Sequence, residues 1–296
     1  MAISEEITAW KHAFESDQQS ILSTLSSLAW DFASYTAVVE LVRAAPESRG
    51  EKRLSPLVMD LLARGFWNGS ILAIRRLVDN APLSGPRGVC SLRAMVNVAR
   101  AARRRITRRV YIEEIAGLAY NYELTKKNYW GWLLSQEPGP KWVPREFHYE
   151  SSQLRHAEFD WLAGVQSGTS SPDDLIREEV FDQLERRLSR LDAIADHATV
   201  LVAHSATDHS RQGRVLANWN LGEAKEALRQ LTEIAELVGR WFCFSGVGTV
   251  LPTPQFNQFA YLDEPMLHGS VEPLTRAWDT FAAEAEQWRR IENSRL

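Results

Sequence analysis

Residues 171–205 read SPDDLIREEVFDQLERRLSRLDAIADHATVLVAHS. Apolar side chains recur in this stretch at steps of three and four residues, at Val180, Leu184, Leu188, Leu191, Ile194, Ala198 and Leu201. Such a repeat places the side chains on one face of an α-helix. The stretch opens on a serine, a proline and two acids, which is typical of a helix start. The sequence therefore predicts one long amphipathic helix that buries its apolar face against other helices.

The other periodic segments have the same helical spacing. They start near Asp17, Ser55, Ser91, Asn220 and Ser270. Several of these residues can accept hydrogen bonds from the first free backbone N–H groups of a helix. No convincing alternating strand is found, and residues 134–150, which contain three prolines and Gly139, predict a long loop. We expect a single α-helical domain over 1–296, with a bundle core at about 17–245 and a C-terminal helical extension at about 246–296.

The composition is that of an ordinary soluble globular protein. The 296 residues are 45% hydrophobic and 24% charged, with a formal net charge of −4. No apolar run approaches the ~20 residues that span a bilayer, and the acidic N-terminus lacks a signal-peptide pattern. Two cysteines, Cys90 and Cys243, are too few for a disulfide framework or a zinc site. We therefore expect a cytoplasmic protein without a membrane segment.

The first candidate for chemistry is the histidine that ends the long predicted helix. His204 follows Val202-Ala203, and His197 lies seven residues earlier. An imidazole at a helix end can transfer protons near neutral pH or bind phosphate. The two histidines would lie ~10 Å apart along a straight helix, too far to share one metal ion. The alternative interpretation is a polar helix flank in which both histidines are structural.

Two phrases of the chain resemble the HEPN superfamily of helical proteins, and its abortive-infection branch in particular. One is the helix that ends in Val202-Ala203-His204-Ser205. The other is AIRRLVD at Ala73–Asp79, followed after a loop by Ser91-Leu92-Arg93. The resemblance implies an all-α, HEPN-like bundle with additional N- and C-terminal helices. It also implies a homodimer that belongs to a phage-defence or toxin-type system and has an antitoxin-like protein partner.

The resemblance further implies a metal-independent endoribonuclease, because active relatives cleave RNA with an Arg-x(4–6)-His motif from each of two subunits. His204 matches the histidine, but His197, Ala198 and Thr199 stand where the arginine would fall. We expect His197 to act as an auxiliary catalytic residue. Nearby arginines are then expected to contact phosphate: Arg190, Arg211 and Arg214. The missing arginine also favours an alternative, a catalytically inactive module for dimerisation and protein interaction.

A second basic signal follows the helix that starts at Ser91. Six arginines fall within ten residues: Arg100, Arg103, Arg104, Arg105, Arg108 and Arg109. Clustered arginines supply sequence-independent affinity for nucleic acid, and the aromatic residues that follow at 120–142 can stack on bases. The cluster is therefore a candidate RNA-binding site. The alternative is a solvated helix end whose arginines pair with neighbouring acids.

A metal site is a more distant alternative. His204, Asp208 and His209 have a spacing that would suit three ligands at a helix end, as in a metal-dependent hydrolase. No Gly-rich nucleotide loop, nucleophile elbow, paired-cysteine motif or His-Glu-x-x-His motif occurs. We therefore expect neither a metal ion nor another cofactor.

The phrase at Ala73–Asp79 ends its helix with Arg75, Arg76 and Asp79. Two arginines beside an aspartate can form a buried ion-pair network or part of a site. The sequence favours the structural network and leaves the second interpretation open.

Overall fold

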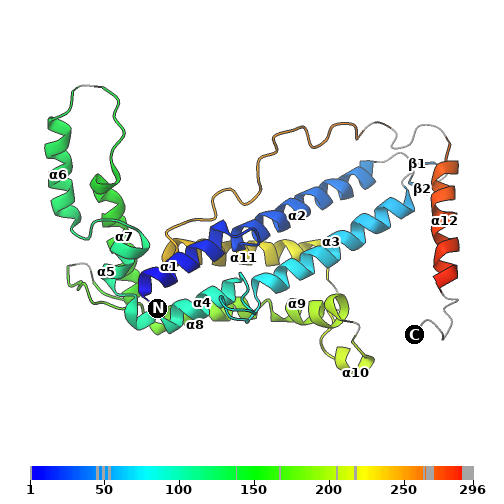
Figure 1. Ribbon diagram of the computed structural model, residues 1–296, viewed down its shortest axis with the longest axis horizontal. Helices are drawn as coiled ribbons and strands as arrows, with labels where there is room; N and C mark the ends of the chain where they lie inside the picture. Colours follow the sequence, from blue (N-terminus) through cyan, green and yellow to red (C-terminus); the bar gives the residue numbers. More distant parts are fainter. Residues whose placement is uncertain are drawn as a thin grey trace. The chain divides into compact units, whose positions relative to one another are not determined.

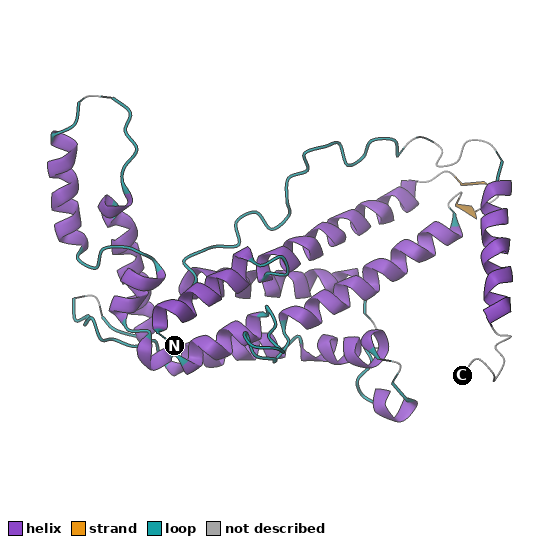
Figure 2. Ribbon diagram, viewed as in Figure 1, coloured by secondary structure: helices purple, strands orange, loops and turns teal. Residues whose placement is uncertain are grey.

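The computed structural model describes residues 2–44, 47–48, 51–52, 55–137, 139–166, 168–204, 206–216, 219–262, 264 and 270–288. The chain divides into two compact units, Met1–Pro252 and Thr253–Leu296, and each is considered by itself. Within the described ranges the fold is helical apart from one antiparallel pair of two-residue strands, β1 (Glu47–Ser48) and β2 (Glu51–Lys52) (Figure 2). The expected all-α class is therefore confirmed.

Three long helices form the centre of the first unit (Figure 1). α2 (Ile21–Ala44) and α3 (Pro56–Leu77) make an antiparallel hairpin, and α11 (Leu221–Phe242) packs against both. The other helices of this unit are α1 (Ile3–Lys11), α4 (Leu92–Ala101), α5 (Arg108–Val110), α6 (Tyr122–Leu134), α7 (Tyr149–Ala163), α8 (Glu178–Ser189), α9 (Asp192–His197) and α10 (Asp208–Arg211). Short 3-10 turns lie at Arg103–Arg105 (η2) and Arg145–Phe147 (η4), and π-helical turns at His12–Ser16 (η1), Tyr111–Ile115 (η3) and Ala198–Ala203 (η5).

Side-chain caps fix three of the predicted helix starts. The Ser55 hydroxyl accepts from the N–H of Val58 at the start of α3, and the Ser91 hydroxyl accepts from that of Ala94 at 2.9 Å in α4. Asn220 Oδ1 accepts from two N–H groups at the start of α11. Each cap satisfies backbone donors that have no partner within the helix. These starts could therefore be predicted from local sequence alone.

The prediction of a single long helix over residues 171–205 is wrong. α8 begins only at Glu178, α9 follows after a break, and the last turn is the π-helix η5. The first residues of the predicted helix instead bond to the segment before α5. Leu175 forms an isolated antiparallel bridge with Thr107, and the Asp174 carbonyl accepts from the N–H of Arg108 at 3.0 Å. These tertiary hydrogen bonds outcompete the local preference for helix.

The apolar face of that predicted helix is nevertheless in the core. Its first six residues, from Val180 to Ala198, are at most 7% exposed, whereas Leu201 is 41% exposed. A π-helical turn contains more residues than an α-helical turn, so the three-and-four repeat runs out of phase at η5. Close packing elsewhere in this core depends on Gly239 in α11, where a Cβ would collide with the ring of Phe14 and the carbonyl of Ser245.

The predicted loop at 134–150 connects α6 to α7 and contains the short turn η4. Aromatic contacts hold it: Trp132 stacks on Phe147 with ring centroids 5.2 Å apart, and Tyr129 lies 5.6 Å from Tyr149. The arm formed by residues 122–150 carries equal numbers of basic and acidic side chains. Its aromatic residues therefore do not coincide with an excess of positive charge.

Of the helices within the described ranges, only α3 is long and apolar enough to cross a membrane by length and composition. One such helix is weak evidence, so the expectation that the chain has no membrane segment stays a prediction. Asp60 and Arg64, which pair on its surface, interrupt the apolar residues, and 22% of the apolar window is buried within the structure. The cytoplasmic location stays a prediction.

The second unit contains turns followed by the amphipathic helix α12 (Glu272–Trp288). The Ser270 hydroxyl accepts from the N–H of Glu272 at 3.1 Å, as expected for the helix predicted to start there. Large apolar side chains on α12 are all more than half exposed: Leu274, Trp278, Phe281 and Trp288.

Candidate functional site

His204 lies directly after the π-helical turn η5 in the first unit. Its backbone is extended and its side chain is exposed. η5 packs against α3, and its residues Ala198 and Val200 are buried. The exposed imidazole is therefore attached to a turn that the core holds in place.

His197 is half-buried at the end of α9. Its Nδ1 accepts a hydrogen bond from the backbone N–H of Leu216 at 3.0 Å, and burial lowers the pKa of the ring. A neutral imidazole that accepts at Nδ1 carries its proton on Nε2. The neutral imidazole of His197 thus holds the segment after α10 in place. This structural contact was not predicted from the sequence.

Arg75, on α3, is hydrogen-bonded to the π-helical turn η5. Its Nε donates to the hydroxyl of Thr199 at 3.1 Å, and that hydroxyl donates to the carbonyl of Ala195 at 2.9 Å. Thr199 precedes His204 by five residues, which is one turn of a helix with i→i+5 hydrogen bonds. A guanidinium from another helix therefore lies about one turn from the candidate histidine.

The arrangement expected for Arg75, Arg76 and Asp79 is not formed. Arg76 Nη2 donates to Gln19 Oε1 at 2.7 Å, and Asp79 Oδ1 accepts from the N–H of Ala81 at 2.8 Å. Asp79 lies beyond the end of α3, where a short carboxylate bonds most readily to the backbone of its own turn. The prediction of an Arg–Asp network is therefore wrong, and Arg75 is directed to η5 instead.

The three arginines proposed as phosphate contacts lie in different surroundings. Arg211 pairs with Asp208 within α10, and Arg214 Nη2 lies 3.2 Å from Asp196 Oδ1. Arg190 is exposed at the end of α8, and in the described part of the chain its guanidinium makes no hydrogen bond or ion pair. Exposed ion pairs are weak and easily exchanged, so all three side chains can still meet an anion.

His204, Asp208 and His209 do not form a metal-binding group. Across the described ranges no cluster of three or more His, Cys, Asp or Glu side chains is placed to hold an ion. Asp208 is instead paired with Arg211.

Three members of the six-arginine cluster connect helices by pairing with carboxylates. Arg100 on α4 lies 2.6 Å from Asp182 and also bonds Glu178, both on α8. Arg103 on η2 lies 3.5 Å from Glu178 and also donates to the carbonyl of Ile176 at 2.6 Å. Arg105 lies 2.7 Å from Glu6 on α1. These side chains contribute to packing between elements that are far apart in sequence.

Arg108 is fully buried between α5, α7 and the segment before α8. Its Nη2 lies 2.7 Å from Asp160 Oδ1 and 2.9 Å from Asp174 Oδ2, and its guanidinium lies over the ring of Phe159. No ligand can reach it without unfolding this region. Arg108 is therefore excluded as an RNA contact in the folded state.

Only two members of the cluster remain open to solvent without an ion pair in the part of the chain that is described. Arg109 is exposed with its guanidinium 5.6 Å from the ring centre of Tyr120, and Arg104 is exposed on η2. Of the six-arginine cluster, only these two side chains are thus available to a polyanion, because the neighbouring arginines have acidic partners that the sequence does not reveal.

Comparison of the chain with protein-family models, with curated proteins and with solved structures finds no match.

Proposed function

We propose that this protein is a HEPN-like, metal-independent endoribonuclease in which Arg75 replaces the missing motif arginine. The observation that carries the proposal is the hydrogen bond from Arg75 Nε to Thr199 Oγ1, one π-helical turn before His204. Only one nitrogen of the guanidinium is used in this bond, and its remaining N–H groups have the fork geometry that suits phosphate oxygens.

The chemistry follows from these two groups. His204 takes the proton of a ribose 2′-hydroxyl, whose oxygen attacks the adjacent phosphorus atom. The 5′-oxygen of the next nucleotide leaves and takes a proton from the His204 imidazolium of a second copy. Arg75 stabilises the negative charge that develops on the non-bridging phosphate oxygens. The products are a 2′,3′-cyclic phosphate and a 5′-hydroxyl end.

The proposal includes a homodimer, because the two proton transfers require two histidines. Exposed Arg190 and Arg104 would contribute sequence-independent contacts to the RNA backbone. A nuclease of this kind must be restrained in its own cell, so the proposal also includes a phage-defence or toxin-type role in the cytoplasm with an antitoxin-like protein partner.

The test is cleavage of end-labelled RNA by the full chain in EDTA, with His204→Ala compared to His209→Ala. His209 is also an exposed histidine five residues further on, so it is a matched control. We expect wild type and His209→Ala to cleave equally, and His204→Ala to lose about 10²–10⁴-fold in rate. Absence of cleavage by wild type, or equal rates for both variants, would overturn the proposal.

A second candidate function is a catalytically inactive dimerisation module. It is favoured by α12, where Leu274, Trp278, Phe281 and Trp288 repeat at heptad-compatible steps and are 58–67% exposed. Such a stripe is usually buried against another helix. Sedimentation of Trp278→Ser/Phe281→Ser tests this candidate: the module predicts a wild-type dimer that dissociates in the variant, while a monomeric wild type contradicts it.

A further inference from the structure

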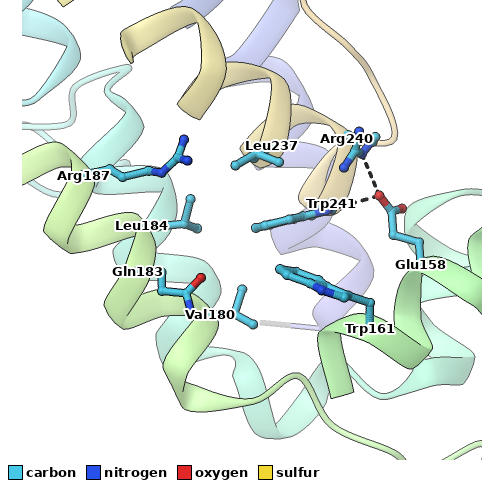
Figure 3. A pocket seen from close by; sticks show the side chains of 9 residues that line it. All are labelled: Glu158, Trp161, Val180, Gln183, Leu184, Arg187, Leu237, Arg240 and Trp241. Carbon is cyan, nitrogen blue, oxygen red and sulfur yellow. Dashed lines mark hydrogen bonds and ion pairs between the residues drawn. The ribbon is translucent and has the colours of Figure 1, made fainter. Parts of the chain in front are cut away.

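A cavity of about 380 Å³ lies between α7, α8 and α11 in the first unit (Figure 3). Its apolar walls come from all three helices: Val180 and Leu184 on α8, Leu237 and Trp241 on α11, and Trp161 on α7. Small-molecule sites have this size range and combine apolar walls with a few polar groups. The cavity is distinct from η5, because none of its lining residues belongs to α3, α9 or η5.

Two tryptophans form one side of the cavity. The rings of Trp161 and Trp241 lie 5.7 Å apart with an interplanar angle of 34°. Trp241 is 4% exposed and its Nε1 donates to Glu158 Oε1, so the inner ring is fixed. Trp161 is 54% exposed, so a large aromatic surface borders the opening. The exposed ring of Trp161 can stack with a planar aromatic ligand.

Two guanidinium groups lie at the polar rim on opposite sides. Arg187 reaches from α8 toward α11, and Arg240 lies beside Glu158 (Figure 3). Arg240 uses its Nε to bond Glu158 at 2.6 Å, and within the described ranges its Nη atoms make no hydrogen bond or ion pair. Arg187 has only an exposed 3.4 Å contact with Glu233, which an anion can replace at little cost.

The charges around the rim determine which anion fits. Two separate ion-pair networks border the rim. The one around Arg187 is balanced, with two arginines and two glutamates: Arg187, Arg229, Glu226 and Glu233. The one around Arg240 has two arginines and one glutamate: Arg155, Arg240 and Glu158. One positive charge is left without a counter-charge. A carboxylate carries one negative charge, whereas a phosphate monoester carries about 1.5 to 2 at neutral pH. The balance therefore favours a carboxylate.

We propose that this cavity binds a small planar aromatic carboxylate. The aromatic ring lies against Trp161 and Trp241, and its edge contacts Leu184 on the facing helix. The carboxylate accepts hydrogen bonds from Arg187 and from the Nη groups of Arg240. This binding site is independent of the proposed RNA chemistry, so His204→Ala leaves it unchanged and either proposal can fail alone.

The experiment is titration calorimetry of the full chain with indole-3-carboxylate and with its neutral amide, indole-3-carboxamide. We expect a dissociation constant for the carboxylate between about 10 µM and 1 mM, a reasonable range for a ligand of twelve heavy atoms. The amide should bind at least tenfold more weakly, because it has no charge to share with the arginines. Adenosine 5′-monophosphate serves as the aromatic phosphate and should also bind more weakly.

Matched variants assign the binding to this cavity. Arg187→Gln should weaken carboxylate binding about tenfold, while Arg186→Gln, one position earlier on α8 and outside the cavity, should not. Trp161→Ala should weaken it at least fivefold, whereas Trp142→Ala, which removes a 91% exposed ring elsewhere, should not. Equal binding of acid and amide, tighter binding of the nucleotide, equal effects of the two arginine variants, or no binding at all would overturn the proposal.

Discussion

Replacing Arg108 by alanine should destabilise the first unit strongly, because this arginine is a buried connection between three segments. Its side chain is fully buried and lies 2.7 Å from Asp160 and 2.9 Å from Asp174. It also donates to the carbonyl of His156 at 3.2 Å. The substitution leaves two carboxylates that are themselves less than one-fifth exposed without their counter-charge.

The expected magnitude follows from that burial. Removing one partner of a buried ion pair costs about 3–5 kcal/mol, because the remaining charge is desolvated and unpaired. For a domain of this size, each kcal/mol corresponds to a change in Tm of about 2–4 °C, so the Tm should fall by roughly 6–20 °C. A double substitution, Arg108→Ala with Asp174→Asn, should recover part of this loss, since it removes one of the stranded charges.

Urea unfolding followed by circular dichroism, together with scanning calorimetry, measures the effect. Arg104→Ala is the matched control, since Arg104 belongs to the same cluster but is exposed on η2. We expect no measurable change in its unfolding midpoint. If Arg108→Ala unfolds within 1 kcal/mol of wild type, or if both variants are equally destabilised, the structural assignment of this cluster is refuted.

Three further predictions concern pH, packing and RNA. Burial lowers the pKa of both His156 and His197 below the ordinary 6.5. The unfolded chain therefore binds protons first, and the free energy of unfolding should fall as the pH drops below about 6.5. Urea midpoints at pH 7.5, 6.5 and 5.5 measure this effect, and a flat profile would contradict it. Gly239→Ala should lower the Tm by several degrees, because the added methyl meets the core, whereas Gly65→Ala in open space on α3 should hold or raise it; calorimetry distinguishes the two. If RNA binds as proposed, Arg104→Ala should weaken it equally for all sequences and reduce the salt slope by about 1, as measured by filter binding, and an unchanged slope would remove Arg104 from the interface.

Local sequence signals predicted the helix starts well. Ser55, Ser91 and Asn220 each cap the helix that they were expected to start, because a short polar side chain satisfies the same free N–H groups wherever it occurs. The apolar repeat from Val180 to Ala198 also identified core residues correctly. Both signals act over one or two helical turns, and this is why sequence alone reveals them.

Features that depend on tertiary partners could not be predicted in this way. The expected helix start at 171–177 is lost to hydrogen bonds with the segment before α5, about 65 residues earlier. The arginine cluster has the composition of a nucleic-acid site, yet Arg100, Arg105 and Arg108 are paired with acids on three other segments. Composition gives the number of charges and not their neighbours.

The candidate site also combines a residue that the sequence reveals with one that it does not. His204 could be identified from its place at the end of an apolar helix, but Arg75 could not be connected to it. The two elements that meet, α3 and η5, are separated by more than a hundred residues. The auxiliary catalytic role expected for His197 stays a prediction; in the structure its Nδ1 accepts a hydrogen bond from the backbone N–H of Leu216. The contact between α3 and η5, which is not local in sequence, places the Arg75 guanidinium against Thr199.

The most direct test of the central claim is the single-turnover rate of RNA cleavage in EDTA by Arg75→Ala, measured beside Arg76→Ala. Arg76 is the adjacent residue on α3 and bonds Gln19 rather than η5. If Arg75 supplies the charge that the motif lacks, its loss should reduce the rate about 10²–10³-fold, with Arg76→Ala close to wild type. Equal rates for the two variants, at any level of activity, would contradict the account.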